Sequence, residues 1–452
     1  MKIKHIICIA CCSLTFESCE LMGSLDNLKQ DYVLTDDNAV TNLNTAESSL
    51  AGIYNCWKDF SIGAFRDLMF VRSQSLADVN QSGAVQFRTN VIESDNTQLS
   101  SIYTKLYYII ANANSFISNL NKATLSDVTT KRKAEMLSEA YFNIALAETQ
   151  LLRLFGEFYD MNSIYGIVIW DQPIRSNEAK ARSTVKESYE HILSCLDKAG
   201  ASETGKNYHA NPLAVKALRT RLLLDMQNYS EAAKMAGELT SMLSLESDYL
   251  NNFRTPESSS EVLFTLKCQY PNGTLSGPSL TYYNKPGILL TSLSKSLVVS
   301  GSDARFTNVF GSTQEGSYGN NKYLFPEGTA GETNTHFFIR LSEVFLIKAE
   351  AEARLKNYSE ARAALKVVTD RAGYDADYVN SISDANLIEK ILEHKYVELF
   401  MENYEDWFDM VRLYKLDGKV LGGCANIAAG KTLILPIPRT ALAGNNLLIP
   451  NP

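Results

Sequence analysis

The chain has 452 residues, 45% of them apolar and 21% charged, which is enough to bury a substantial core and typical of a globular protein. A formal net charge of −8 argues against a nucleic-acid partner, and the basic run at residues 131–133 is interpreted as a solvated helix face. Beyond the first residues no run approaches ~18 apolar positions, so no transmembrane helix is expected.

The first 18 residues have the pattern of an export signal. Two lysines precede a mostly apolar segment at residues 6–16, which is too short to span a bilayer and ends before Ser18-Cys19. A small residue followed by cysteine here resembles a bacterial lipoprotein signal, in which the cysteine is lipidated and becomes the mature N-terminus. We predict a signal peptide over residues 1–18 and lipid attachment at Cys19. The alternative is an ordinary signal peptide with Cys19 incidental.

The cysteines give no disulfide framework. Four of the eight lie in the export segment, including a C-x-x-C spacing that is removed with it. Two disulfides are conceivable in an exported protein, but four separate buried thiols are the simpler prediction. The four remaining cysteines are Cys56, Cys195, Cys268 and Cys424.

The N-terminal part is predicted to be a tether followed by helices. Residues 20–43 are polar and lack periodicity, whereas residues 44–59 form an amphipathic helix with Asn44 as N-cap and Glu47 completing a capping box. Residues 60–98 carry Gly, Ser, Asn and Gln and are interpreted mostly as loop.

Three more helices are predicted before the middle of the chain. The apolar spacing over residues 99–121 and 133–155 predicts two long antiparallel helices. Residues 167–169 are a candidate short strand. Residues 184–199 form another helix, with Ser183 as its N-cap.

A sequence repeat indicates the architecture. The pentapeptide Asn-Tyr-Ser-Glu-Ala occurs at residues 228–232 and again at residues 357–361, each time between two helical runs. Helix pairs are therefore predicted at residues 212–245 and 341–372. A unit of ~34 residues in this form is the tetratricopeptide type of repeat, which stacks into a scaffold with an extended binding surface.

The predicted fold is mainly α: a tetratricopeptide-like scaffold carrying an irregular, loop-rich lobe. The lobe, residues 251–335, is rich in Ser, Gly, Asn, Pro and Thr, and long loops in compact proteins are usually functional. Residues 387–413 form one strongly amphipathic helical stretch, and the tail from residue 433 is extended. One compact globule is expected, with an N-terminal helical part at residues 19–250 and a C-terminal part at residues 251–452.

Motifs for metal, nucleotide or hydrolytic chemistry are not found. The histidines are far apart and no H-E-x-x-H or His/Cys cluster is recognised, so no metal site and no cofactor are predicted. Gly430-Lys431-Thr432 resembles the end of a phosphate-binding loop, but the required first glycine is Ala425. Acids at helical surface spacing are interpreted as salt-linked or solvated faces: Glu350, Glu352, Glu398 and Glu402. Candidate ion-pair partners for such acids, inside the scaffold, are Arg340, Arg371 and Arg412.

Aromatic residues among Gly, Ser and Asn suggest a ligand-binding surface on the loop lobe. Aromatic faces beside polar side chains suit sugars, whose ring faces stack and whose hydroxyls need hydrogen-bond partners. The alternative is that most of these rings pack the lobe onto the helices. The proposed ligand contacts are Phe87, Arg88, Tyr282, Tyr283 and Tyr318.

Short motifs recur along the chain in a characteristic order. They are Gly52-Ile53-Tyr54, Ala113-Asn114-Ser115-Phe116-Ile117, Glu139-Ala140-Tyr141-Phe142 through Leu154-Phe155-Gly156, Arg340-Leu341-Ser342-Glu343 with Ala349-Glu350-Ala351, Thr369-Asp370-Arg371-Ala372-Gly373, Glu398-Leu399 with Glu402, Trp407-Phe408-Asp409 and Arg412, and Leu435-Pro436-Ile437-Pro438. In order and spacing, these motifs resemble those of the SusD/RagB family of outer-membrane lipoproteins from the Bacteroidetes. The late motifs are the most specific, and Lys395 and Asn403 depart from the family's usual Arg and Gly.

The resemblance implies a lipoprotein of the outer membrane that faces the cell exterior. It would bind a nutrient, usually a glycan, cap a SusC-like TonB-dependent transporter, and carry four tetratricopeptide-like helix pairs without catalytic activity. It transfers no ligand-contact residue, and the three tryptophans (Trp57, Trp170 and Trp407) fall in stretches predicted as scaffold. Two alternatives remain: a peptide-binding relative, and a surface glycoside hydrolase, which needs two carboxylates about 5–10 Å apart.

Overall fold

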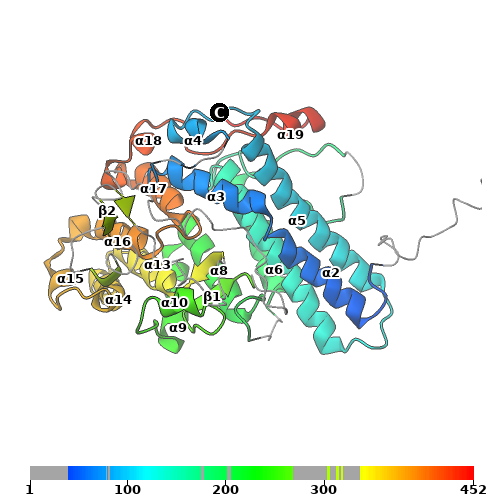
Figure 1. The fold of residues 1–452 in the computed structure, drawn as a ribbon, viewed down its shortest axis with the longest axis horizontal. Helices are drawn as coiled ribbons and strands as arrows, with labels where there is room; N and C mark the ends of the chain where they lie inside the picture. The colour runs from blue at the N-terminus through cyan, green and yellow to red at the C-terminus, as the bar shows by residue number, and fades with distance from the viewer. Residues whose placement is uncertain are drawn as a thin grey trace, which may run out of the picture.

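Helices dominate the structure, a computed structural model in which a helical body runs from residue 39 to the C-terminus (Figure 1). Cys19, the tether, Cys268, Tyr282 and Tyr283 lie outside the described residues. The structure describes residues 39–77, 79, 82–174, 178–200, 205–267, 303–305, 312–314, 317–318 and 336–452.

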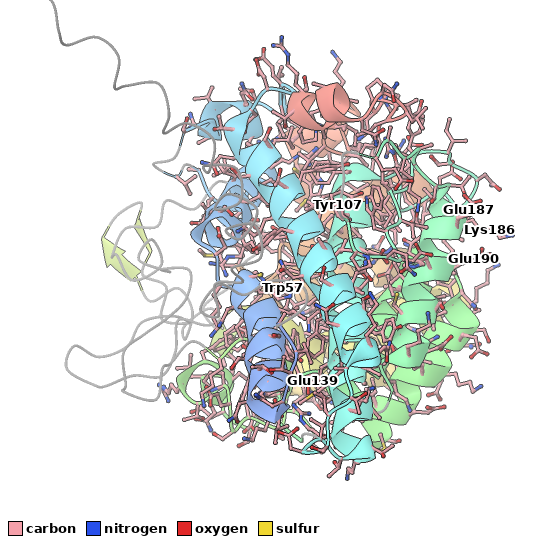
Figure 2. The ribbon with its side chains drawn as sticks, turned by 90° about the vertical axis from the view of Figure 1, so that its right-hand side faces the viewer. Trp57, Tyr107, Glu139, Lys186, Glu187 and Glu190 are labelled. Atoms are coloured by element: carbon pink, nitrogen blue, oxygen red, sulfur yellow. The ribbon has the colours of Figure 1, made fainter. Side chains whose placement is uncertain are left out.

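Three helices form one side of the body: α2 (Leu43–Cys56), α5 (Thr97–Lys122) and α6 (Thr130–Phe155). Figures 1 and 2 show α2 lying along the long α5–α6 pair, which confirms the two predicted antiparallel helices. The start of α2 differs from the prediction, because Asn42 and Thr45 form the capping box in place of Asn44 and Glu47.

A correction concerns residues 60–98, predicted mostly as loop. They include α3 (Phe60–Arg72) and the short α4 (Ala84–Arg88). Residues 62–71 are buried without interruption, so α3 has no exposed face and no amphipathic period by which to recognise it. Asp59 caps α3 by accepting a hydrogen bond from the Ser61 amide at 2.9 Å.

The next helix, α7 (Val185–Lys198), begins one residue later than predicted. Thr184, not Ser183, is its N-cap and forms a capping box with Glu187. Residues 167–169, predicted as a strand, have no strand pairing; the Ile167 carbonyl instead accepts from the Ser183 amide at 2.8 Å.

Both predicted repeat pairs are confirmed. The first is α8 (Pro212–Asp225) with α9 (Tyr229–Met242), and the second is α13 (Leu341–Arg354) with α14 (Tyr358–Arg371). Within each pair the helices pack together, and α13 also packs on α9, which joins the two pairs into one scaffold.

The repeated pentapeptide makes the same turn twice. Gln227 and Lys356, which precede it, have φ of 60° and 64°, the left-handed conformation that ends a helix. The next amide reaches back over the last turn in each copy: Asn228 N–H bonds the Leu223 carbonyl, and Asn357 N–H bonds the Glu352 carbonyl, both at 2.9 Å. Identical residues at the start of α9 and α14 therefore follow identical backbone turns.

The helical stretch predicted over residues 387–413 is divided. It consists of α16 (Asp384–Glu398) and α17 (Glu405–Asp417), separated by a turn in which Met401 and Tyr404 have φ of 60° and 44°. Tertiary contacts hold this turn. Asn403 Oδ1 accepts from Gln150 Nε2 of α6 at 3.4 Å, and the Tyr404 hydroxyl donates to Gln150 Oε1 at 3.0 Å.

Short elements complete the described chain. Strands β1 (Val262–Thr265) and β4 (Phe337–Arg340) pair antiparallel, so they bring the two ends of the loop lobe together on the scaffold. The tail predicted to be extended contains one short helix, α19. The remaining elements are α10 (Asn251–Arg254), β2 (Ser312–Gln314), β3 (Ser317–Tyr318), α15 (Tyr378–Ser381), η1 (Leu421–Gly423), α18 (Ala425–Ala428) and α19 (Arg439–Gly444).

The three arginines proposed as ion-pair partners form ion pairs inside the scaffold, which confirms that prediction. The solvated alternative for Glu350, Glu398 and Glu402 is wrong, because these three acids are buried. Buried charges are tolerated when they are paired and hydrogen-bonded, as here. The pairs include Arg340–Glu398 (3.1 Å), Arg340–Glu402 (2.8 Å), Arg371–Glu398 (2.5 Å) and Arg412–Glu350 (2.5 Å).

The two residues that differ from the usual motif, Lys395 and Asn403, make polar contacts in the structure. Lys395 Nζ lies 2.9 Å from Asp409 Oδ1, so an ion pair is present despite the loss of a guanidinium. Asn403 Oδ1 accepts from His336 Nε2 at 3.1 Å. Both side chains are buried, which makes them part of the core rather than of a surface site.

The described cysteines Cys56, Cys195 and Cys424 are free thiols. Among the described helices, none combines the length and the apolar character needed to cross a membrane.

Candidate ligand-binding site

The described residues bring together only part of the predicted ligand set. Phe87 is fully buried, with its ring edge-on to Phe65 at 5.8 Å, so it offers no face to a ligand. Arg88 is exposed at the end of α4. Tyr318 is described only by its backbone in β3. The assignment of Phe87 as a stacking ring is therefore replaced by a packing role.

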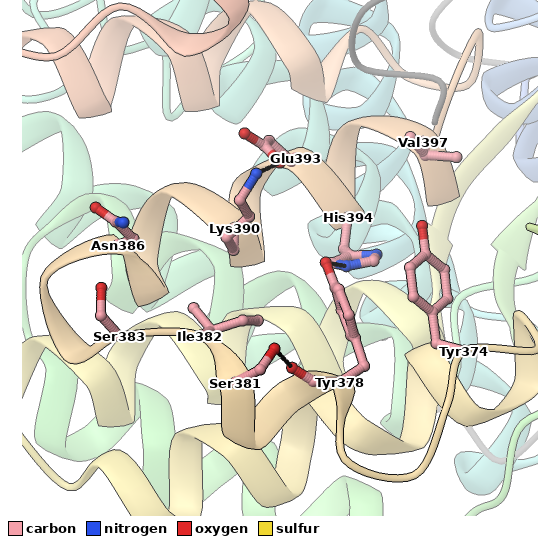
Figure 3. A pocket seen from close by; sticks show the side chains of 10 residues that line it. All are labelled: Tyr374, Tyr378, Ser381, Ile382, Ser383, Asn386, Lys390, Glu393, His394 and Val397. Carbon is pink, nitrogen blue, oxygen red and sulfur yellow. Dashed lines mark hydrogen bonds and ion pairs between the residues drawn. The ribbon is translucent and has the colours of Figure 1, made fainter. Parts of the chain in front are cut away.

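A pocket of about 440 Å³ opens between α16 and the segment that holds Tyr374 and α15 (Figure 3). Its volume lies in the range of about 300–1,000 Å³ that is typical of small-molecule sites. Two tyrosines and a histidine form one side, and polar side chains from α15 and α16 form the other. The lining residues are Tyr374, Tyr378, Ser381, Ile382, Ser383, Asn386, Lys390, Glu393, His394 and Val397.

Local sequence rules explain how these side chains reach the pocket. Gly373, with φ of 87°, ends α14 and lets the Tyr374 amide bond the Thr369 carbonyl at 3.1 Å, which turns Tyr374 out of the helix. On α16, Asn386, Lys390 and His394 recur every four residues and so share one helix face.

The aromatic side of the pocket is an interlocked group of three rings. The centroids of Tyr374 and Tyr378 lie 4.4 Å apart at an interplanar angle of 45°. Both rings are edge-on to His394, at 5.0 and 5.4 Å. Each tyrosine is only partly buried, so part of each ring remains available to a bound molecule.

Hydrogen bonds assign the protons of this group. Arg305 donates to His394 Nδ1 at 3.0 Å, so the imidazole proton is on Nε2, which donates to the Tyr378 oxygen at 2.9 Å. Burial, then the Arg305 charge, holds the pKa of His394 well below its usual value, so the ring is neutral. The Tyr378 hydroxyl proton is then directed away from His394 and can be donated to a ligand.

Residues 303–305 of the loop lobe lie behind the aromatic side of the pocket and hold its side chains in place. Asp303 accepts from Tyr374 Oη at 3.1 Å and from Arg305 Nη2 at 2.7 Å. The Ala304 amide bonds the Ala372 carbonyl at 2.9 Å. The pocket therefore lies where the lobe is attached to the helical scaffold.

This arrangement can bind a polar ligand but offers little for hydrolysis. Tilted rings, a hydroxyl donor and an amide meet the needs of a molecule that has both apolar faces and hydroxyl groups. Among the described lining residues, Glu393 is the carboxylate, and Lys390 lies 2.6 Å from it. A glycosidase requires a second carboxylate about 5–9.5 Å away across an open cleft.

None of these pocket residues is among the ligand contacts predicted from the sequence. In the sequence His394 is one of several dispersed histidines, and the apolar residues of α16 dominate its pattern, which is typical of a scaffold helix. The sequence feature that could have identified the pocket is the spacing of four between Tyr374 and Tyr378, directly after the Arg-Ala-Gly motif. Two of the tryptophans predicted as scaffold, Trp57 and Trp407, are buried.

Fold and pocket together define a helical-repeat protein with a polar, aromatic binding pocket. A family model described as the SusD family matches residues 297–448, and a model described as "Starch-binding associating with outer membrane" matches residues 39–224. The two matches do not overlap, and between them they take in most of the chain. The chain belongs to the SusD family.

Solved structures share this fold. A SusD superfamily protein from Bacteroides thetaiotaomicron has a TM-score of 0.75 at 22% identity, over 91% of this chain and 100% of that one. One from Bacteroides fragilis has a TM-score of 0.76 at 22% identity, over 90% and 99%. A protein described as a laminarin-binding SusD-like protein has a TM-score of 0.71 at 17% identity, over 91% and 100%. No curated protein matches the sequence significantly.

Proposed function

We propose that this protein binds a nutrient glycan at the cell surface and delivers it to a SusC-like TonB-dependent transporter. Lipid attached to Cys19 would anchor it in the outer membrane, facing the cell exterior. The observation that carries the binding proposal is the pocket between α15 and α16, which two tilted tyrosines line together with hydroxyl, amide and ammonium groups. The names of the starch-binding family model and of the laminarin-binding structure favour the same ligand class.

The protein acts by capture rather than by catalysis. One carboxylate held by an ammonium group is a poor basis for acid–base hydrolysis, whereas it can accept hydrogen bonds from sugar hydroxyls. The loop lobe would extend the binding surface around the pocket. Arg88, Tyr282, Tyr283 and Tyr318 remain proposed contacts to the ligand.

Retention on polysaccharide-containing native gels tests the ligand class. The full chain, purified in detergent, is run through gels with and without laminarin or starch. Retardation by a polysaccharide is expected, with an affinity of roughly 4–8 kcal/mol, or millimolar to micromolar, because a carrier must release its cargo. Retention of peptides without any glycan retardation would support the peptide-binding alternative, and release of reducing sugar would support a hydrolase.

A further inference from the structure

A second group of chemistry-bearing side chains lies far from this pocket, between α6 and α7. His191 and Cys195 are four residues apart on α7 and so share one helix face. Glu148 on α6 lies opposite them, and one ligand atom from each of the three falls within 4.8 Å of the others. This group was not predicted from the sequence, because His191 was considered only with the other histidines and Cys195 only with the other cysteines.

The contacts within the group are close to those of a metal site. His191 Nδ1 lies 2.8 Å from Glu148 Oε2, and Cys195 Sγ lies 4.0 Å from the same nitrogen. Zinc bound tetrahedrally at about 2.0–2.3 Å from N, O and S ligands separates those ligands by roughly 3.3–3.8 Å. To hold an ion, the 2.8 Å contact would have to lengthen and the 4.0 Å contact to shorten, each by less than about 1 Å.

The carboxylate of Glu148 is a second, independent observation that favours a bound ion in this group. The side chain is fully buried, yet its second oxygen, Oε1, has no hydrogen-bond partner. A buried carboxylate oxygen without a partner is costly, and such atoms call for a missing ion or water. The hydrogen bond from His191 satisfies only the other oxygen, Oε2.

The group is reachable from solvent. A pocket of about 350 Å³ is lined by His191 and Cys195 together with Asp171 and Lys198. Asp171 interacts electrostatically with Glu148 and His191, which favours a cation, whereas the Lys198 charge opposes one. On the outer side of α7, Lys186, Glu187 and Glu190 point into solvent (Figure 2). The inward face of α7 thus carries the candidate ligands.

We infer that Glu148, His191 and Cys195 form a binding site for a zinc-like divalent ion, with a fourth position open to the pocket. One thiolate sulfur, one imidazole nitrogen and one carboxylate oxygen are ligands that Zn²⁺ and Co²⁺ accept in tetrahedral sites. Binding forms bonds from the metal to Sγ, Nδ1 and a Glu148 oxygen. It releases the thiol proton and the proton that Nδ1 shares with Glu148.

Cobalt substitution tests the site. The full chain in detergent, reduced and stripped with a chelator, is titrated with Co²⁺ and followed by optical absorption. We expect one equivalent to give a thiolate-to-cobalt charge-transfer band with tetrahedral d–d bands, and Zn²⁺ to abolish both. Cys195→Ser is expected to lose the charge-transfer band. His191→Gln is expected to weaken binding by at least tenfold, because losing even an outer partner costs about 10–100-fold.

The matched control is Cys56→Ser, a half-buried thiol on α2 outside the group, which should titrate like the wild type. Should Cys195→Ser fail to fold, alkylation of the wild type replaces it, with Zn²⁺ expected to protect Cys195 from iodoacetamide by at least tenfold. No thiolate–cobalt band in the wild type, the same band in Cys195→Ser, or unchanged alkylation of Cys195 would each overturn the inference.

Discussion

At the scale of single residues, the scaffold depends on charges removed from water. Glu350 is fully buried and accepts from Arg412 Nη2 at 2.5 Å and from Arg354 Nε at 2.9 Å. Burial alone would raise the pKa of Glu350, but these two guanidinium groups overcome it and lower the pKa from 4.5 to about 2. This carboxylate therefore links folding stability to pH.

The sign of that linkage gives a prediction for acid unfolding. Because the folded-state pKa lies below the unfolded value, the contribution of Glu350 is fully present above pH 4.5 and is lost as the pH falls toward 2. Glu350→Gln is expected to destabilise the protein at pH 7 by about 3–5 kcal/mol, since it leaves buried arginine charge uncompensated. The variant should also lose less stability than the wild type between pH 4.5 and 2.

Urea unfolding at a series of pH values measures both effects. Glu190→Gln, at an exposed position on α7, is the matched control and should follow the wild-type curve. If Glu350→Gln and the wild type show parallel curves below pH 4.5, Glu350 is not the titrating group.

At the scale of elements, α13 is the helix on which the scaffold depends, since it packs against α8, α9, α14 and α16. Small residues allow this close approach. Ala349 and Ala351 are both fully buried, so neither has room for a larger side chain. The Ala-Glu-Ala motif therefore combines close packing with a buried ion pair.

Overpacking tests this role. Ala351→Leu is expected to destabilise the protein by about 1–3 kcal/mol, because its side chain would press on the neighbouring helices. The denaturant midpoint should fall accordingly. Ala363→Leu, at an exposed position on α14, is the matched control and should change little. An unshifted midpoint for Ala351→Leu would show that α13 is less tightly enclosed than the structure indicates.

Sequence periodicity predicted α5, whose apolar residues recur at helical spacing on one face. Helix α13 is buried almost all round, but the repeated pentapeptide marks the turn that follows it. Helix α3 is also buried all round and has no such marker. The break between α16 and α17 was missed because tertiary contacts at Asn403 and Tyr404 override the helical pattern. Local patterns cannot show which helices will surround a segment.

The binding sites were less predictable than the fold. The pocket group of Tyr374, Tyr378 and His394 depends on Arg305, which comes from a segment far away in sequence. Phe87 was predicted as a ligand contact because its neighbours are polar, but its ring is part of the core. Whether a ring stacks on a ligand or on another ring is decided by tertiary contacts.

At the scale of the whole molecule, the proposed function attaches the helical body to a membrane through one residue. Cys19→Ala is expected to yield a folded protein that no longer partitions with membranes, because the acyl chains provide the anchoring. Fractionation of cells lacking the partner transporter measures this without contributions from the complex. Cys56→Ala should remain in the membrane fraction, and retention of Cys19→Ala there would contradict the lipoprotein assignment.

The organisation of the loop lobe on the scaffold is also a whole-molecule property. Strands β1 and β4 close its two ends, and residues 303–305 attach it beside α14 and α16. The lobe thus supports the pocket from behind, through hydrogen bonds to Tyr374 and His394. The division of the chain at residues 250 and 251 stays a prediction.

Calorimetric titration of pocket variants tests the central claim most directly. The polysaccharide that retards the wild type is titrated into the wild type and into Tyr378→Ala/Asn386→Ala, which removes one ring and one amide from the pocket. The matched control is Tyr108→Ala/Asn112→Ala, which removes the same two residue types from α5, where Tyr108 is 52% exposed. A stacked ring contributes about 0.5–1.5 kcal/mol beyond area burial, so the pocket variant should bind at least several-fold more weakly while the control binds normally. Wild-type affinity in a folded pocket variant would contradict the account.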